Sequence, residues 1–242
     1  MVKGSSDCED LIFPGVSARL GGMSRASIHL VRHGEVFNPD GILYGRLPEF
    51  HLSDLGREMA DRVAQHFQER CSDGAKLVYL VASPLTRAQE TAAPISRALG
   101  VETVTDERIL EAENRFEGLP GVKRQLRNPR YWPLLRNPMK PSWGEPYAQQ
   151  VERVMAAVHD ARIRALELGG SGAEAVLVSH QLPIWVTRLA AEGRRLWHDP
   201  RSRECTLTSV TTLDFNDMEL TGVRYAEPSA DLLPGAANLP GA

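Results

Sequence analysis

Three short apolar runs alternate with stretches of helical periodicity, and this alternation constrains the fold more than any other feature of the sequence. The runs are Ile28–Val31, Leu77–Ala82 and Ala175–Ser179. Compact apolar runs of this kind are typical of strands that are covered on both faces. Because helical stretches lie between and after them, we expect an α/β protein: a three-layer α/β/α sandwich with a mostly parallel central sheet.

The helical stretches have apolar residues at the spacing of one helix face. One stripe runs from Leu55 to Phe67 behind Ser53, which we expect to be its N-cap. A second runs from Leu85 to Leu99; we expect Ser83 to cap it and Pro84 to occupy its first helical position. The remaining expected elements are a third helical stripe and two loosely alternating edge strands, over Val151–Val158, Thr206–Leu213 and Gly222–Tyr225.

Length and composition indicate one ordinary globular domain. The chain has 242 residues, a net charge of −3 and 42% hydrophobic residues, which excludes a globally basic nucleic-acid binder and a disordered chain. The three cysteines form no C-x-x-C pair, so we expect neither a disulfide framework nor a zinc site, and a cytoplasmic location. The sequence has no apolar stretch of the roughly 18 residues that a membrane span needs.

The two ends of the chain have no hydrophobic period. We expect residues 1–26 to be a disordered extension, residues 27–226 to be the folded domain and residues 227–242, rich in Pro, Gly and Ala, to be a disordered tail. Within the domain, residues 118–144 combine basic residues with Tyr131, Trp132 and Trp143 and contain no acid. We interpret this segment as a lid over an anionic substrate or, equally, as a solvated insertion.

Polar residues follow each of the three predicted strands. Arg32-His33-Gly34 follows the first run, Ser83 and Arg87 follow the second, and His180-Gln181 follows the third. Ligands bind at the carboxyl ends of the strands in open α/β sheets, so we expect these side chains to converge. Arginine forks match phosphate oxygens, and an imidazole held among them can attack phosphorus. The sequence therefore predicts a phosphate site with a histidine nucleophile.

These residues resemble three signatures of the histidine phosphatase superfamily, the phosphoglycerate mutase-like proteins. The first is Arg32-His33-Gly34 with Asn38 and Gly45-Arg46 downstream; the others are the segments that begin at Ser83 and at Val178. The resemblance covers residues 28–212 and implies the phosphoglycerate mutase-like fold. It implies that His33 becomes phosphohistidine and that His180 takes part in catalysis. The residues expected to bind substrate are Arg32, Asn38, Arg87 and Gln181.

The family also has a carboxylic acid that protonates the leaving oxygen, between the second and third signatures. The matching stretch offers Glu111 and Glu113 and is one residue shorter than the common form. We choose Glu111, with Glu113 as the alternative. Glu145, in a stretch that resembles the Gly-Glu-Ser element of the family, either contacts a pocket arginine or begins a helix.

The resemblance implies a metal-independent hydrolase that acts on a small phosphorylated substrate through phosphohistidine, a histidine acid-type phosphatase. No metal-ligand spacing such as H-E-x-x-H is present, and we expect no cofactor, no nucleic acid and no membrane partner. Two alternatives stay open: a phosphoglycerate mutase, which returns the phosphoryl group to its substrate, and a phospho-ligand binding module without turnover. The identity of the substrate and the presence of a homodimer also stay open.

Overall fold

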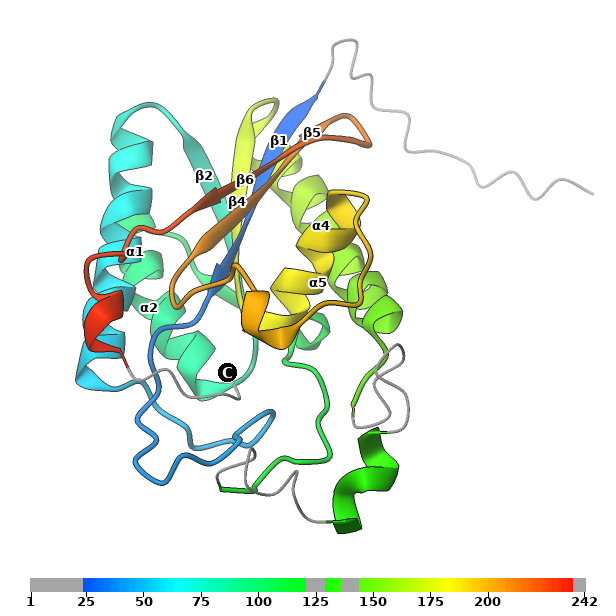
Figure 1. Cartoon of the computed structure of the whole chain (residues 1–242). Coiled ribbons are helices and arrows are strands. Elements are labelled where there is room, and N and C mark those ends of the chain that lie inside the picture. Colours follow the sequence, from blue (N-terminus) through cyan, green and yellow to red (C-terminus); the bar gives the residue numbers. More distant parts are fainter. Residues whose placement is uncertain (1–23, 121–128, 136–143, 237–242) are drawn as a thin grey trace, which may run out of the picture.

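The computed structural model describes residues 24–120, 129–135 and 144–236 (Figure 1). Among these residues, six strands form one sheet in the order β3-β2-β4-β1-β5-β6. Their bounds are β1 Arg25–Arg32, β2 Lys76–Ala82, β3 Thr103–Thr105, β4 Ala173–Ser179, β5 Val210–Asn216 and β6 Glu219–Ala226. β1 to β4 run parallel to one another, whereas β5 pairs antiparallel with β1 and β6 pairs antiparallel with β5. The expected mostly parallel sheet is confirmed.

One of the two expected edge strands is internal. β5 lies between β1 and β6 and is buried along most of its length, so only β6 is an edge on that side. The loose alternation over residues 206–213 was therefore a poor guide, because a strand paired on both sides and covered on both faces needs no polar face.

Two pairs of helices cover the two faces of the sheet, as Figure 1 shows. α1 (Asp54–Ser72) and α2 (Thr86–Leu99) pack on one face, and α4 (Tyr147–Gly169) and α5 (Gln181–Ala191) pack on the other. On β1, Ile28 and Leu30 point to the α4 and α5 side and Val31 to the α1 and α2 side. In the described part of the chain, no helix has the length and apolar character needed to cross a membrane.

The start of α1 follows the prediction and the start of α2 does not. The Ser53 hydroxyl accepts a hydrogen bond from the Gly56 amide at 2.9 Å and caps α1. α2 begins at Thr86 with Leu85 as its N-cap residue and without a side-chain cap. The Ser83 hydroxyl is instead hydrogen-bonded to His180, and this tertiary contact competes with local capping.

Ordered structure extends beyond both expected domain boundaries. β1 starts at Arg25, inside the expected extension of residues 1–26. Residues 227–236 lie against α1: the Ser229 hydroxyl is buried and donates to the Met59 carbonyl, and Arg62 pairs with Asp231 at 3.1 Å. These contacts hold residues 227–236 on the domain, although their composition predicted a tail. The described ranges also contain four short 3₁₀ helices: η1 Glu107–Ile109, η2 Pro129–Leu135, η3 Pro200–Ser202 and η4 Leu233–Gly235.

Candidate active site

Three adjacent strands bring the predicted residues to one end of the sheet. The His33 amide bonds to the Ser179 carbonyl at 3.1 Å, and the Ser83 amide bonds to the Val178 carbonyl at 2.9 Å, which ties the ends of β1 and β2 to β4. As a result, the rings of His33 and His180 lie with their centroids 5.2 Å apart. The expected convergence of residues from distant parts of the chain is present in the structure.

His33 is a buried, neutral imidazole with one free ring nitrogen. Its Nδ1 lies 2.7 Å from the Gly34 carbonyl; a carbonyl only accepts, so Nδ1 carries the proton. Its Nε2 is buried and makes no hydrogen bond within the described residues. Burial, together with the charges of Arg87 and Arg32, holds the pKa of His33 well below its ordinary value. The Nε2 lone pair is therefore available at neutral pH.

Gly34 is required at the turn after His33. A Cβ atom there would lie 2.5 Å from the Gly56 carbonyl oxygen in the first turn of α1. The absence of a side chain lets α1 approach the end of β1 closely. The Gly34 amide donates to the Thr91 hydroxyl on α2 at 3.1 Å, which fixes the same turn from a second helix.

Two buried arginines flank the histidines without a carboxylate partner. Arg32 donates to the Cys205 carbonyl at 2.7 Å, and Arg87 donates to the Gly45 carbonyl at 2.6 Å. The Arg87 guanidinium also lies over the ring of Tyr44, 4.7 Å from its centroid. Among the residues that the structure describes, neither arginine forms an ion pair, and both Nε atoms are buried without a partner. Two desolvated cations held by neutral groups favour an anionic ligand.

His180 is oriented by Ser83 and also has a free ring nitrogen. Its Nε2 lies 2.7 Å from the Ser83 hydroxyl, while its buried Nδ1 has no partner among the described side chains and backbone. Burial and the charge of Arg87 hold the pKa of His180 well below its ordinary value. Ser83 thus positions a second neutral imidazole beside the first.

The structure separates the two candidate acids. Glu111 is 6% exposed; its Oε1 accepts from the Ala112 amide at 2.8 Å, and its Oε2 has no partner in the described ranges. Burial raises the pKa of Glu111, although the Ala112 hydrogen bond and the charges of Arg87 and Arg203 oppose the rise. The Glu113 side chain is 70% exposed and pairs with Arg46 at the surface. A buried carboxyl with a raised pKa suits proton donation, and this geometry favours Glu111.

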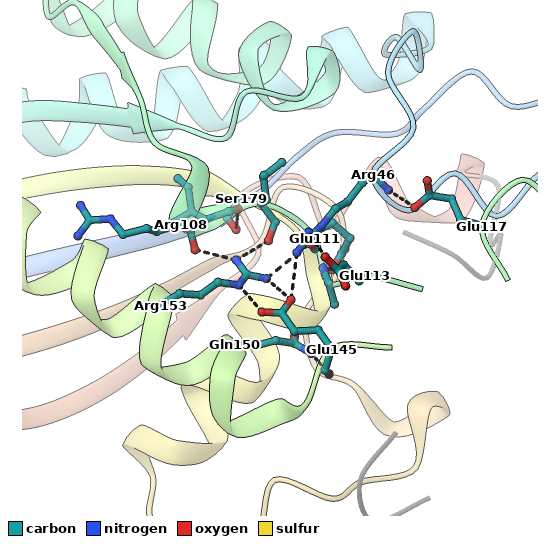
Figure 2. Close-up of polar contacts among 12 residues, drawn as sticks. Arg46, Arg108, Glu111, Glu113, Glu117, Glu145, Gln150, Arg153 and Ser179 are labelled. Carbon is teal, nitrogen blue, oxygen red and sulfur yellow. Dashed lines mark hydrogen bonds and ion pairs between the residues drawn. The ribbon is translucent and has the colours of Figure 1, made fainter. Parts of the chain in front are cut away.

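A network of charged residues supports the backbone of Glu111 (Figure 2). Arg46 donates from Nε to the Glu111 carbonyl at 2.6 Å, and Arg153 donates to the Leu110 carbonyl at 2.7 Å. Glu145 joins the two arginines, at 3.1 Å to Arg46 and 2.7 Å to Arg153. Of the two readings of Glu145, the structure supports contact with arginines, but with Arg46 and Arg153 and not with Arg32 or Arg87.

Asn38 and Gln181 use their polar atoms on nearby backbone. The Asn38 amide bonds to both the amide and the carbonyl of Ile42, at 3.0 and 2.8 Å, and so closes its own loop. Gln181, the first residue of α5, donates to the Cys205 carbonyl at 3.3 Å and accepts from Arg203 at 3.2 Å. Binding of substrate by either residue stays a prediction.

Several residues near the site were missed by sequence reasoning. Tyr44 packs on Arg87, Arg153 holds the acid segment, and Arg203 lies close enough to Glu111 to affect its pKa. Arg153 lies within the apolar stripe of α4 and Arg203 in a loop, and nothing in their local sequence marks them. Most of the basic residues of the expected lid lie outside the described residues, so the lid also stays a prediction.

Within the described ranges, no three His, Cys, Asp or Glu side chains are grouped as metal ligands would be. The cationic groups that face the two histidines are arginines. Fold and site together define an α/β protein with two neutral histidines, two unpaired arginines and one buried acid at the carboxyl end of its sheet.

This arrangement belongs to a known class, and the chain is a member of it. The family model of the histidine phosphatase superfamily (branch 1) matches residues 28–228. The chain therefore belongs to this superfamily, and its fold is the phosphoglycerate mutase-like α/β fold expected from the three signatures.

Individual relatives are consistent with this assignment. The uncharacterized protein Rv0525 of Mycobacterium tuberculosis is 50% identical over 206 residues, which cover 84% of this chain and 96% of that protein. The structure of the mycobacterial glucosyl-3-phosphoglycerate phosphatase Rv2419c superimposes with a TM-score of 0.67 at 23% identity, covering 84% and 98% of the two chains. The phosphoserine phosphatase of Entamoeba histolytica, in complex with 3-phosphoglyceric acid, gives a TM-score of 0.65 at 20% identity, covering 84% of this chain and 98% of that chain. At these identities, the two solved structures support the fold alone.

Proposed function

We propose that the protein is a phosphatase that hydrolyses small phosphomonoesters through a phosphohistidine on His33. The observation that carries the proposal is the free, buried Nε2 of His33 between two arginines that have no carboxylate partner among the described residues. A neutral nitrogen next to unpaired positive charge suits attack on a phosphoryl group. A relative named glucosyl-3-phosphoglycerate phosphatase, from Mycolicibacterium vanbaalenii and 27% identical over 164 residues, supports hydrolysis as the first expectation for this chain.

In the first step, the lone pair of His33 Nε2 forms a bond to phosphorus while the bond from phosphorus to the alcohol oxygen breaks. Phosphoryl transfer spreads negative charge over the equatorial oxygens, and the Arg32 and Arg87 guanidiniums stabilise that charge. The Nδ1–H bond to Gly34 keeps the attacking nitrogen unprotonated and oriented. These cations supply the charge stabilisation that the reaction needs, so we propose a metal-independent mechanism.

Glu111 is the proposed acid for the same step. Its carboxyl starts protonated, because burial and a nearby phosphate dianion both favour the neutral form. The proton passes from Glu111 to the alcohol oxygen as that oxygen leaves. The resulting carboxylate then takes a proton from water, whose oxygen attacks phosphohistidine; the P–N bond breaks and phosphate is released.

His180 is proposed to bind the transferred phosphoryl group. Its Nε2 is held by the Ser83 hydroxyl, and its free Nδ1 lies in the same buried site as His33. If Ser83 donates to Nε2, Nδ1 carries the proton and can donate to a phosphoryl oxygen. We assign Asn38 to the surrounding pocket, as the resemblance implies, and we assign Gln181 to it because this residue directly follows His180 at the end of β4.

The test is phosphate release and a covalent intermediate in one experiment. Protein treated with a chelator is incubated with p-nitrophenyl phosphate, and samples quenched in alkali are analysed by mass spectrometry. We expect steady phosphate release and a phosphoryl adduct on His33. Turnover without any adduct on His33 at short times would contradict the mechanism, and loss of turnover with the chelator would contradict metal independence.

A second assay separates hydrolysis from the mutase alternative. The protein is given 3-phosphoglycerate with catalytic 2,3-bisphosphoglycerate. We expect free phosphate; formation of 2-phosphoglycerate without phosphate release would identify a mutase. Phosphate binding without either product would identify a binding module.

A further inference from the structure

Arg203 is a cation near the site that has only neutral partners. Its Nε donates to Nε2 of His198 at 2.9 Å, and its Nη1 donates to the amide oxygen of Gln181 at 3.2 Å. No ion pair to Arg203 is formed by the acids in the described part of the chain. It lies in the loop before β5, where Arg194 and Arg201 pair with acids; Arg201, two residues away, pairs with Asp199 at 2.6 Å.

The contacts of Arg203 fix the direction of its guanidinium. His198 Nδ1 lies 2.8 Å from the Leu196 carbonyl, so Nδ1 carries the proton and Nε2 accepts from Arg203. Burial lowers the pKa of His198, which keeps the ring neutral. The ring is packed against Tyr147, with centroids 5.4 Å apart. Two fixed neutral acceptors therefore hold Nε and Nη1, and Nη2 makes no hydrogen bond to the described residues.

Arg203 is also tied to the phosphoryl-binding arginine. Gln181, which accepts from Arg203, donates to the Cys205 carbonyl at 3.3 Å, and Arg32 donates to the same carbonyl at 2.7 Å. The two arginines are thus joined through one glutamine and one backbone oxygen. This chain of hydrogen bonds connects Arg203 to the proposed phosphoryl site.

Arg203 also lies near Glu111, the proposed acid. Arg203 and Glu111 are close enough for each charge to affect the pKa of the other. Under the proposed mechanism, Glu111 protonates the leaving oxygen, so the alcohol part of the substrate lies beside that carboxyl. Burial lowers the pKa of Arg203, yet a guanidinium stays charged in proteins. A partly desolvated cation at this position is best satisfied by an anion on the alcohol.

We propose that Arg203 is a specificity-determining residue that binds a second anionic oxygen group, a carboxylate or a second phosphate, on the alcohol part of the substrate. The inference rests on the proposed function and adds the substrate class: phosphomonoesters of small alcohols that have a further negative charge. Arg32 and Arg87 bind the phosphoryl group that is transferred, and Arg203 binds the group that stays on the product.

The experiment compares three substrates with the same three-carbon skeleton: glycerol 3-phosphate, 3-phosphoglycerate and glycerol 1,3-bisphosphate. They have, respectively, no second anion, a carboxylate and a second phosphate. In the unmodified protein we expect kcat/KM for 3-phosphoglycerate, for glycerol 1,3-bisphosphate or for both to exceed that for glycerol 3-phosphate by about tenfold or more. This is the effect of a charge-assisted hydrogen-bond pair. A preference for 3-phosphoglycerate identifies the second group as carboxylate, and one for the bisphosphate alone identifies it as phosphate.

The variants are Arg203→Ala, Arg203→Lys and, as a matched control, Arg201→Ala. Arg203→Ala should reduce the preference to within about threefold, mainly through a raised KM for the favoured substrate, and Arg203→Lys should retain part of it. Arg201 has a side chain that is 90% exposed, and its removal should leave the preference unchanged. Inhibition by inorganic phosphate should be the same in all three variants and reports an intact phosphoryl pocket.

The failures are distinguishable. Absence of a preference in the unmodified protein, or an equal loss on all three substrates in Arg203→Ala, overturns the role of Arg203 and leaves the phosphatase proposal standing. If p-nitrophenyl phosphate is hydrolysed but none of the three substrates is, the role of Arg203 is likewise overturned and the phosphatase proposal stands. Absence of phosphate release from every substrate overturns the proposed function itself.

Discussion

Two buried histidines, one on strand β1 and one directly after it, have opposite surroundings. His29, in the middle of the strand, has both ring nitrogens paired: Nδ1 with the Thr212 hydroxyl at 2.8 Å and Nε2 with Glu174 at 2.7 Å. Arg70 on α1 completes this group through Glu174 at 2.8 Å. His33, just after the strand, has one nitrogen paired and one free. Burial is the same for the two rings, so burial alone does not indicate function.

The two rings also have different tautomers. Glu174 only accepts, so His29 carries its proton on Nε2, whereas the Gly34 carbonyl fixes the proton of His33 on Nδ1. Unpaired buried polar atoms destabilise a fold by about 1–3 kcal/mol each. The free nitrogens of His33 and His180, with Oε2 of Glu111, are concentrated at one end of the sheet. The atoms left unpaired around His33 lie where a ligand could bind them, whereas both ring nitrogens of His29 are already paired within the sheet.

The largest expected effect is on turnover by His33→Ala. Removing the nucleophile removes the covalent path, so we expect kcat for p-nitrophenyl phosphate to fall by at least about a thousandfold. Circular dichroism should show an unchanged fold. If the variant retained more than about a tenth of the activity, the free nitrogen of His33 would not be the nucleophile and the contrast with His29 would lose its functional meaning.

The next effect concerns the acid. Glu111→Gln should lower kcat for an alkyl phosphate by about 10²–10³-fold, because the leaving alkoxide then lacks a proton donor. Glu113→Gln, a change at an exposed ion pair, should alter kcat by less than about threefold. Burial raises the pKa of Glu111, so activity of the unmodified protein should fall as the pH rises through that value; this limb should be absent in Glu111→Gln. A larger loss in Glu113→Gln would reverse the assignment.

In the middle of β1, around His29, we expect a substitution to affect stability and not turnover. His29→Ala leaves Thr212 and part of the Glu174 charge without a partner in the sheet, so we expect the free energy of unfolding to fall by about 2–3 kcal/mol. Turnover per folded molecule should stay within about twofold of the unmodified protein. Urea unfolding and kcat measured on the same samples test both statements. A loss of kcat without a loss of stability would show that the middle of β1 takes part in catalysis.

The smallest effect is the pH dependence of stability. The pKa of folded His33 lies well below its ordinary value of 6.5, chiefly through burial. Below that ordinary value the unfolded chain binds the extra proton first, so stability falls as the pH is lowered from neutral. His33→Ala should reduce the loss of stability between about pH 7.5 and pH 5.5 by up to about 1.4 kcal/mol. Urea titrations at the two pH values test this, and an unchanged loss would indicate that His33 is already protonated when folded.

The sequence predicted the layers and the parallel strands because apolar runs and helical stripes record which faces are buried. It also predicted that residues after three strands meet, since parallel strands end at the same edge of a sheet. Local capping was less secure: Ser53 caps α1, whereas the Ser83 hydroxyl serves His180, a residue nearly a hundred positions later. The turns over residues 227–236 had no periodic pattern and depend on contacts with α1.

The family, the sheet and the positions of His33, Arg32, Arg87 and His180 could be predicted without coordinates, because each of these residues belongs to a short motif at the end of a predicted strand. The different exposure of Glu111 and Glu113, the arginine partners of Glu145 and the proximity of Arg203 to Glu111 became visible only in the three-dimensional structure. The physical reason is that exposure, tautomer and charge pairing depend on neighbours distant in the chain. A residue type and its local spacing contain no record of those neighbours.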